Sequence, residues 1–419
     1  MFKFQFFFFL FLQTSLLFGQ KQIQQFVQQN SHPLLTISPN STNYEDLTII
    51  GNAIGDARIV LMGEQDHGDA STYLAKTRLV KYLHEKKEFD VLAFESDFFG
   101  LNSGWDNLDK SRYKVVDTFL QNNVLSLWTF CSTCSHLLYN YIPSTQNTDT
   151  PLAVTGFDNQ MNYMYSRAHL IENLDSVLRK ADIAITKEIN YQSEILPLLR
   201  TLITKFGYQL PSADFFEACG KTLHIIKSQW RIKLAGDDFW ALLIDNLIAF
   251  NEEERNFKKD MWKAESIRDE QMFLNLKWLL QEKYANRKVI VWAANNHVAK
   301  YNTKKYTSMG KLLSLDVASS DKMYVIGFTS RMGKGGRLYE NKYIINKPKT
   351  NSLESWLQDS FQYAFVDFAA YNNTYPNSKE LFHMRGWKYW TLQNEWNKVY
   401  DGIFYIKEMY PCESITNNR

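Results

Sequence analysis

Residues 59–68 read Ile-Val-Leu-Met-Gly-Glu-Gln-Asp-His-Gly, a short apolar run that stops abruptly on polar side chains. Three later apolar runs also end on polar residues: Val91–Phe94 before Glu95, Leu152–Thr155 before Asp158, and Val289–Ala294 before Asn295-Asn296-His297. Continuous β-branched and aliphatic runs of this length are typical of buried parallel strands. Ligands of open α/β sheets bind outside the carboxyl ends of such strands. We therefore expect Glu64, His67, Glu95, Asp158 and His297 to meet at one edge of one sheet.

Strand and helix patterns alternate along the chain, which predicts an α/β fold with a mainly parallel sheet flanked by helices. Strands are expected at residues 58–62, 90–95, 151–158, 288–293, 323–330, 336–345, 362–368 and 402–407. Between the third and fourth of these, apolar residues recur at helical spacing, so residues 164–286 are expected to form an inserted all-helical subdomain. The insert separates the first half of the α/β core, residues 21–163, from the second half and the C-terminal α/β portion, residues 287–419.

Residues 1–20 have the layout of a secretory signal peptide. Lys3 provides a positive start, Phe6–Phe18 is largely apolar, and Gly19-Gln20 leads into polar sequence. The apolar stretch is short for a membrane span, and no second long one follows. We expect a periplasmic or secreted protein without a stable membrane span after signal cleavage; the alternative is an uncleaved N-terminal anchor.

Charge and cysteine content narrow the function classes. The net charge of +2 offers no electrostatic basis for nucleic-acid binding. The aromatic content of 15% suits either a pocket for sugars and other bulky ligands or larger aromatic cores. Cys131 and Cys134 have redox or metal spacing but lie in a helical pattern, so we expect two buried apolar side chains on a helix.

The segment Gly63-Glu64-x-x-His67-Gly68 is the strongest local indication of chemistry. Histidine is the side chain best suited to proton transfer near neutral pH, and a nearby carboxylate holds its tautomer. A loop that caps a helix and contains a hydrogen-bonded histidine would look the same. No Gly-x-Ser-x-Gly elbow is present, which disfavours a serine hydrolase. Two histidines and two or three carboxylates could activate water directly or bind a divalent metal.

At this point the sequence resembles the erythromycin esterase-like family, from about Asp46 to Lys407. The resemblance rests on these blocks: Gly63-Glu64-x-x-His67-Gly68, Lys76-x-Arg78-Leu79, the strand ending in Glu95, Arg268-Asp269-x-x-Met272-x-x-Asn275-x-x-Trp278-Leu279, Trp292-Ala293-Ala294-Asn295-Asn296-His297-Val298-Ala299, Met309-Gly310-x-x-Leu313 and Asp401-Gly402. Two positions depart from the family pattern. Lys76 stands where some members have Arg, and Ala294 replaces a frequent His.

The resemblance implies a hydrolase that needs no cofactor and uses a histidine to activate water against an ester or lactone carbonyl. It implies that His67 is the general base, Glu64 its partner, and Glu95 and His297 further catalytic positions. Lys76, Asp158 and Asn296 are expected to line the substrate site. The expected partner is a small-molecule or glycan-type ester, and the family's breadth leaves the substrate open.

Two other hypotheses use the same residues. In one, His67, His297, Glu64 and Glu95 hold a divalent metal that takes part in hydrolysis. In the other, the protein binds a glycan or assists envelope assembly without catalysis; the departures at Lys76 and Ala294 motivate this reading. The oligomeric state is open.

Overall fold

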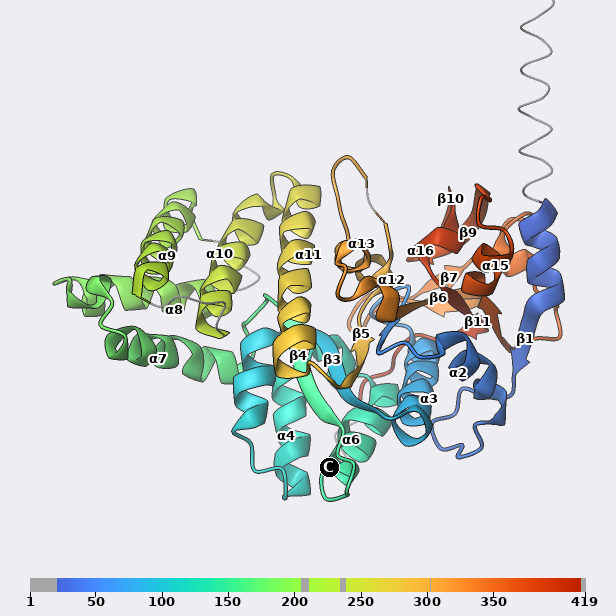
Figure 1. The fold of residues 1–419 in the computed structure, drawn as a ribbon, viewed down its shortest axis with the longest axis horizontal. Helices are drawn as coiled ribbons and strands as arrows, with labels where there is room; N and C mark the ends of the chain where they lie inside the picture. Colours follow the sequence, from blue (N-terminus) through green and yellow to red (C-terminus); the bar gives the residue numbers. More distant parts are fainter. Residues whose placement is uncertain (1–20, 205–210, 234–238, 302, 416–419) are drawn as a thin grey trace, which may run out of the picture.

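The computed structural model describes residues 21–204, 211–233, 239–301 and 303–415, so the predicted signal peptide lies outside the described residues. Its centre is a nine-stranded sheet with the strand order β1-β8-β11-β6-β2-β5-β3-β4, and β7 pairs with β6 (Figure 1). The strands of this sheet are β1 (Ser31–Leu34), β2 (Ile59–Met62), β3 (Phe89–Asp97), β4 (Ala153–Asp158), β5 (Lys288–Trp292), β6 (Met323–Gly335), β7 (Tyr343–Ile345), β8 (Tyr363–Asp367) and β11 (Gly402–Met409). The predicted α/β fold class is confirmed.

All pairings from β4 through β11 along this order are parallel, whereas β8, β1 and β7 add antiparallel pairs. The registers Met62↔Trp292 and Phe94↔Trp292 bring the last residues of β2 and β5 level with Phe94 of β3, the residue before Glu95. Because these three strands are adjacent and parallel, the polar residues after them emerge side by side.

Successive side chains of each strand point to opposite faces of the sheet and pack into two separate cores, one on each face. In β2, Val60 and Met62 pack in one core with helix α3 (Ala70–Lys87). Ile59 and Leu61 pack in the other core with α11 (Met261–Trp278) and α13 (Met309–Leu315). Both faces of the central strands are therefore covered, which explains their uninterrupted apolar sequences.

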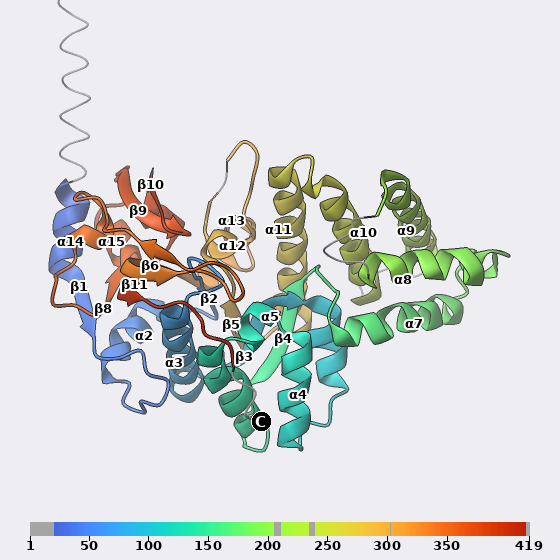
Figure 2. The ribbon, with the colours of Figure 1, turned by 180° about the vertical axis from the view of Figure 1, so that it is seen from behind.

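A helical region stands beyond the β4 edge of the sheet (Figures 1 and 2). It consists of α7 (Met164–Lys180), α8 (Leu196–Thr204), α9 (Ala213–Lys233) and α10 (Phe239–Phe257), and α11 leads back to the sheet. Its apolar side chains form a third core of their own. The side chain of Asp260 caps the start of α11 by accepting a hydrogen bond from the Lys263 amide.

The remaining elements surround the sheet or extend from its C-terminal half. Residues 21–30 are helical, and the others are α2 (Thr48–Ile54), α4 (Tyr113–Asn123), α5 (Ser126–Thr129), α6 (Ile142–Thr145), α12 (Asn295–Val298), α14 (Leu353–Trp356), α15 (Phe368–Thr374), α16 (Trp396–Val399), and a two-stranded sheet of β9 (Phe382–Trp387) and β10 (Trp390–Asn394). Among the described residues, no helix combines the length and apolarity that crossing a bilayer requires.

Several predicted elements differ from the structure. The strand expected at residues 336–345 is confined to Tyr343–Ile345, because Gly336 and Tyr339 have positive φ and turn the chain. The predictions did not include β1, β9 or β10, three short strands without a long apolar run.

The expectation for the cysteines is wrong for Cys131 and right in part for Cys134. Cys131 forms a disulfide with Cys412, 281 positions away, and Cys134 is a buried free thiol. Their segment is no continuous helix: α5 ends at Thr129, and a 3₁₀ turn covers Ser132–Cys134. Nothing in the sequence indicated this pairing, because no local pattern marks a partner 281 positions away.

Candidate active site

The loop after β2 holds Glu64 and His67 in direct contact. His67 Nδ1 lies 2.7 Å from Glu64 Oε1, Glu64 is fully buried, and 14% of the His67 side chain is exposed. The loop is packed too closely for larger residues at its glycines. A Cβ on Gly63 would lie 2.0 Å from the Asn295 side chain, and one on Gly68 would lie 2.5 Å from the Gly336 carbonyl oxygen.

Three donors besides His67 surround the Glu64 carboxylate. Lys76 Nζ donates to Oε2 at 2.7 Å, Trp128 Nε1 donates to Oε1 at 3.0 Å, and the Tyr73 hydroxyl lies 3.4 Å from Oε1. Lys76 is fully buried behind Glu64, where burial lowers its pKa against the opposing effect of Glu64. The predicted substrate contact of Lys76 is therefore corrected: its ammonium faces Glu64 and not the solvent-accessible side of His67.

Glu95, at the end of β3, lies among three cationic or ionisable side chains. Its Oε1 is 2.9 Å from Arg268 Nη2, 3.3 Å from His297 Nε2 and 3.8 Å from His67 Nε2, while Oε2 accepts the Ala294 amide at 2.8 Å. Burial alone would raise the pKa of Glu95, but the charges and hydrogen bonds of His297, His67 and Arg268 hold that pKa well below its usual value. Glu95 is thus an ionised carboxylate.

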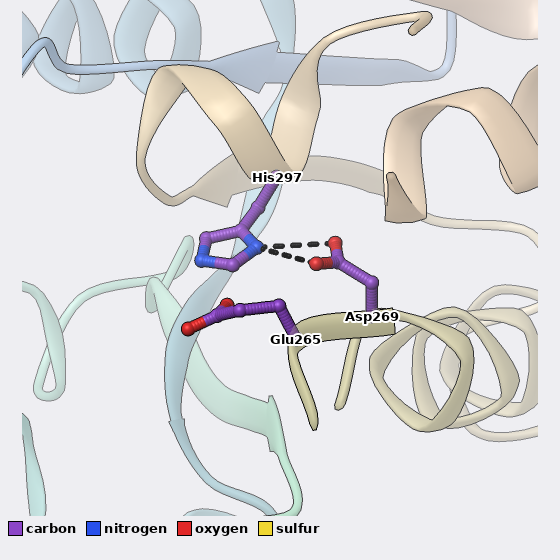
Figure 3. Close-up of side chains that lie close together, drawn as sticks. All are labelled: Glu265, Asp269 and His297. Carbon is purple, nitrogen blue, oxygen red and sulfur yellow. Dashed lines mark hydrogen bonds and ion pairs between the residues drawn. The ribbon is translucent and has the colours of Figure 1, made fainter. Parts of the chain in front are cut away.

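His297, on the short helix after β5, is held between two carboxylates. Its Nδ1 lies 3.0 Å from each oxygen of Asp269 (Figure 3). Its Nε2 lies 3.3 Å from Glu95 Oε1. Asp269 also accepts the Tyr306 hydroxyl at 2.8 Å and the Met309 amide at 2.8 Å. Burial lowers the pKa of His297, but Asp269 and Glu95 outweigh it and raise the pKa well above the usual value. The ring therefore carries a proton on both nitrogens.

Arg268 joins Glu95 to Asp158, the acidic residue at the end of β4. Its Nε and Nη2 donate to the two oxygens of Asp158 at 3.1 and 2.7 Å. Such a two-point pair fixes the plane of the guanidinium. Asp158 is almost fully buried by this contact, whereas 12% of the Arg268 side chain remains exposed. Asn296, half-buried, brings Nδ2 to 3.4 Å from His297 Nε2.

One group of side chains in the described part of the chain has the proximity a metal ion requires: Glu265, Asp269 and His297, whose ligand atoms lie within 4.8 Å of one another (Figure 3). The donor set does not fit a cation well. Both Asp269 oxygens already accept hydrogen bonds, His297 is an imidazolium, and Arg268 lies 3.4 Å from His297 and 3.9 Å from Glu265. A further positive charge would be repelled there. The same repulsion applies to the predicted set of Glu64, Glu95, His67 and His297. Arg268 lies 2.9 Å from Glu95, and Lys76 lies 2.7 Å from Glu64.

A pocket of about 560 Å³ lies beside α5 and the start of α7. It is lined by Asn122, Ser126, Asn162, Tyr163, Met164, Arg167 and Ala168. Ser126 is two residues from Trp128, whose ring packs edge-on against His67 with a centroid distance of 5.8 Å. Burial and the nearby Asp158 raise the pKa of Tyr163.

The structure brings Glu64, His67, Glu95, His297 and Asp158 together in one network, and Asn296 lies at its margin. Sequence reasoning assigned no role to three residues of the same network, which are Arg268, Asp269 and Trp128. Two of them had a visible signal, because Arg268 and Asp269 begin one of the sequence blocks that carry the family resemblance. Trp128 had no such signal, because a tryptophan in an apolar segment is expected to pack in the hydrophobic core.

Comparisons with known proteins place this arrangement in context. The model of the family described as Erythromycin esterase matches residues 84–409. The protein named "Putative hydrolase YbfO" of Bacillus subtilis (strain 168) is 24% identical, with 94% of this chain and 92% of that protein covered. A crystal structure of a Bacillus cereus protein has a TM-score of 0.70 at 18% identity, covering 95% of this chain and 99% of that one. A mutant of the erythromycin esterase EreC in its open conformation has a TM-score of 0.68 at 15% identity, covering 92% and 98%.

Proposed function

The chain belongs to the erythromycin esterase family, whose name and that of its Bacillus relative indicate a hydrolase, and from its site we propose that it hydrolyses an ester or lactone bond with water activated by His67. The observation that carries the proposal is the Glu64–His67 pair. With Nδ1 2.7 Å from a buried carboxylate, the ring keeps its proton on Nδ1 and presents the Nε2 lone pair. That nitrogen lies on the opposite side of the ring from Nδ1 and is 3.8 Å from Glu95 Oε1.

His67 Nε2 and Glu95 Oε1 lie 3.8 Å apart, too far for a direct hydrogen bond. One water molecule donating a proton to each would satisfy both acceptors at ordinary distances of about 2.8 Å. In the proposed step this water attacks the carbonyl carbon while His67 takes its proton. Glu64 stabilises the imidazolium that forms, as a carboxylate does beside other catalytic histidines.

The negative charge that develops on the carbonyl oxygen needs a positive donor. Arg268 takes this role, because its guanidinium is partly exposed and is oriented by Asp158 and Glu95. One such donor contributes about 2.7–4 kcal/mol to transition-state stabilisation in a well-studied protease. His297 remains protonated and so cannot serve as the base; its role is to hold Glu95. His67 then returns its proton to the leaving oxygen.

We also propose that the mature protein acts outside the cytoplasm, in the periplasm or as a secreted enzyme. The predicted signal peptide motivates this location, and the Cys131–Cys412 disulfide supports it, because disulfides persist in oxidising compartments. A periplasmic preparation that contained the protein with residues 1–20 still attached would contradict the proposal.

The test is an assay of the purified mature chain against a panel of lactones, acyl sugars and aryl esters. The His67→Ala variant is expected to lose on the order of 10²–10⁴-fold in kcat, the usual contribution of a general base. His224→Ala, an exposed position on α9, is the matched control and should retain full activity. A second arm adds a chelator, and turnover should not change. Undiminished turnover in His67→Ala would overturn the mechanism, and loss of turnover with chelator would favour the metal-dependent alternative.

A further inference from the structure

Residues 410–415 form a C-terminal tail that runs between the loop of residues 63–69, which contains His67, and the segment that carries Trp128. On one side, the Cys412 amide donates to the Gly68 carbonyl at 2.8 Å, and the Ala70 amide donates to the Tyr410 carbonyl at 2.9 Å. On the other side, the Ser132 amide donates to the Glu413 carbonyl at 2.8 Å, and the Ile415 amide donates to the Phe130 carbonyl at 3.0 Å. The tail therefore links the two segments that contribute to the Glu64–His67 pair.

The disulfide lies at the centre of this link. Cys412 belongs to the tail, and Cys131 follows Trp128 by three residues, with the Cys131 amide donating to the Trp128 carbonyl at 3.1 Å. Both cysteines are buried. The bond thus fixes the tail to the same short stretch that donates the Trp128 hydrogen bond to Glu64.

Trp128 needs an external constraint because its own helix is a single turn. α5 spans four residues, Ser126–Thr129, and a 3₁₀ turn and a π-helical stretch follow instead of a continuous helix. Helices this short do not hold their conformation without tertiary contacts. The Trp128 indole nevertheless contacts both members of the pair, through its N–H to Glu64 and its ring edge to His67.

We propose that the Cys131–Cys412 disulfide is a positioning element of the active site, which holds Trp128 in hydrogen-bonding contact with Glu64 and so sets the proton affinity of His67. This inference rests on the proposed function for its catalytic meaning. Trp128 and the two cysteines act through Glu64 and do not touch the reacting atoms.

The third cysteine of this region does not compete for the bond. Cys134 is buried, and burial together with the nearby Glu64 raises the pKa of its thiol well above the usual value. A protonated thiol is a poor nucleophile in disulfide exchange. The Cys131–Cys412 pairing is therefore stable against rearrangement to Cys134.

The primary experiment measures the His67 titration by NMR, with its ring resonance assigned from His67→Ala. It compares wild type, the double variant Cys131→Ala/Cys412→Ala, and Trp128→Phe, which keeps an aromatic ring but lacks the N–H. Without the Trp128 donor, more negative charge remains on Glu64 for His67. The pKa of His67 is therefore expected to rise by roughly 0.4–1 in both variants, the equivalent of one hydrogen bond. Cys219→Ala, which removes a buried free thiol of the helical region, is the matched control and should leave the titration unchanged.

Two further measurements separate positioning from a purely structural role. In the variants, kcat on any ester found in the panel should fall roughly 2- to 12-fold with little change in KM, because the tail does not line the pocket. Combining Trp128→Phe with the double cysteine variant should add nothing further to the shift, since both changes remove the same contact.

If the double variant does not fold, reduction of the wild type with a phosphine replaces it. The phosphine takes up an oxygen atom from water to give the phosphine oxide, and each cysteine sulfur leaves as a protonated thiol. An unchanged His67 titration in the folded, disulfide-free protein would overturn the proposal, as would an unchanged titration in Trp128→Phe. Because NMR reads the proton affinity directly, a shifted titration without any ester turnover would support the positioning role and contradict the proposed function alone.

Discussion

The buried contact between Lys76 and Glu64 leads to the sharpest prediction for this site. Both side chains are fully buried, and their charged atoms lie 2.7 Å apart. In Glu64→Gln, the amide oxygen replaces only one acceptor, so either Lys76 or the His67 and Trp128 donors face an N–H₂ group. Leaving one partner of a buried ion pair uncompensated costs about 3–5 kcal/mol of unfolding free energy.

Lys76→Met tests the other half of the same contact. Methionine fills a similar volume, and Lys76 Nζ also lies 4.1 Å from the Trp292 ring centre, where an apolar side chain packs well. The single substitution leaves Glu64 charged but without its cation, at a cost of about 3–5 kcal/mol. In the double variant neither charge is buried alone, so its loss should be at least ~2 kcal/mol smaller than the sum of the single losses.

Activity should separate the two single variants. Glu64→Gln removes the carboxylate that holds the His67 tautomer, and the corresponding amide substitution in a serine protease lowers kcat about 10⁴-fold. Lys76→Met keeps that carboxylate with its His67 and Trp128 contacts, so its kcat should fall less. Urea unfolding followed by circular dichroism gives the free energies, and steady-state kinetics on the best substrate gives kcat. Additive stability losses, or a larger kcat loss in Lys76→Met than in Glu64→Gln, would refute this reasoning.

Three further predictions follow from single contacts. Arg268→Lys cannot reproduce the two-point pair with Asp158, so kcat should fall by on the order of 10²–10³-fold. Protein stability is measured in parallel, and an unchanged kcat would contradict the oxyanion role. Burial raises the pKa of Glu253 to about 8, so the folded protein retains a proton that the unfolded chain releases, and the free energy of unfolding declines as pH rises through 5–8. In urea titrations, Glu253→Gln should remove about 2–5 kcal/mol of that decline. Parallel plots of unfolding free energy against pH for the variant and the wild type would argue against it. Tyr306→Phe removes one donor to Asp269 and should cost about 1.5–3 kcal/mol of unfolding free energy, while a cost near zero would show that another donor replaces it.

The sheet and the residues at its strand ends could be predicted from the sequence because they follow from local patterns. Four buried runs predicted strands, and parallel pairing places their carboxyl ends at one edge regardless of how far apart they lie in the chain. This is why Glu64, Glu95, Asp158 and His297 are neighbours in space. The family resemblance also came from the sequence, since its motifs are short blocks at these same strand ends and on the helix before β5.

The side-chain partners were not readable in the same way. Lys76 stands where some members of the family have Arg, and the substrate contact was predicted from that position and its positive charge. The structure corrects this prediction, because the Lys76 ammonium faces the buried side of Glu64. The cysteine pairing shows the same limit, because Cys131 and Cys412 are joined by packing of the tail and have no shared local pattern.

The sequence by itself determined the α/β class, the family and the set of polar residues at the strand ends, because apolar periodicity and strand polarity are properties of neighbouring positions. Only the tertiary structure decided which charges face one another. It places Lys76 behind Glu64, Arg268 between Glu95 and Asp158, and Trp128 against the Glu64–His67 pair. His297 and Glu95 shift one another's pKa, and only the packing of β3 beside β5 brings these two side chains, far apart in the sequence, into contact.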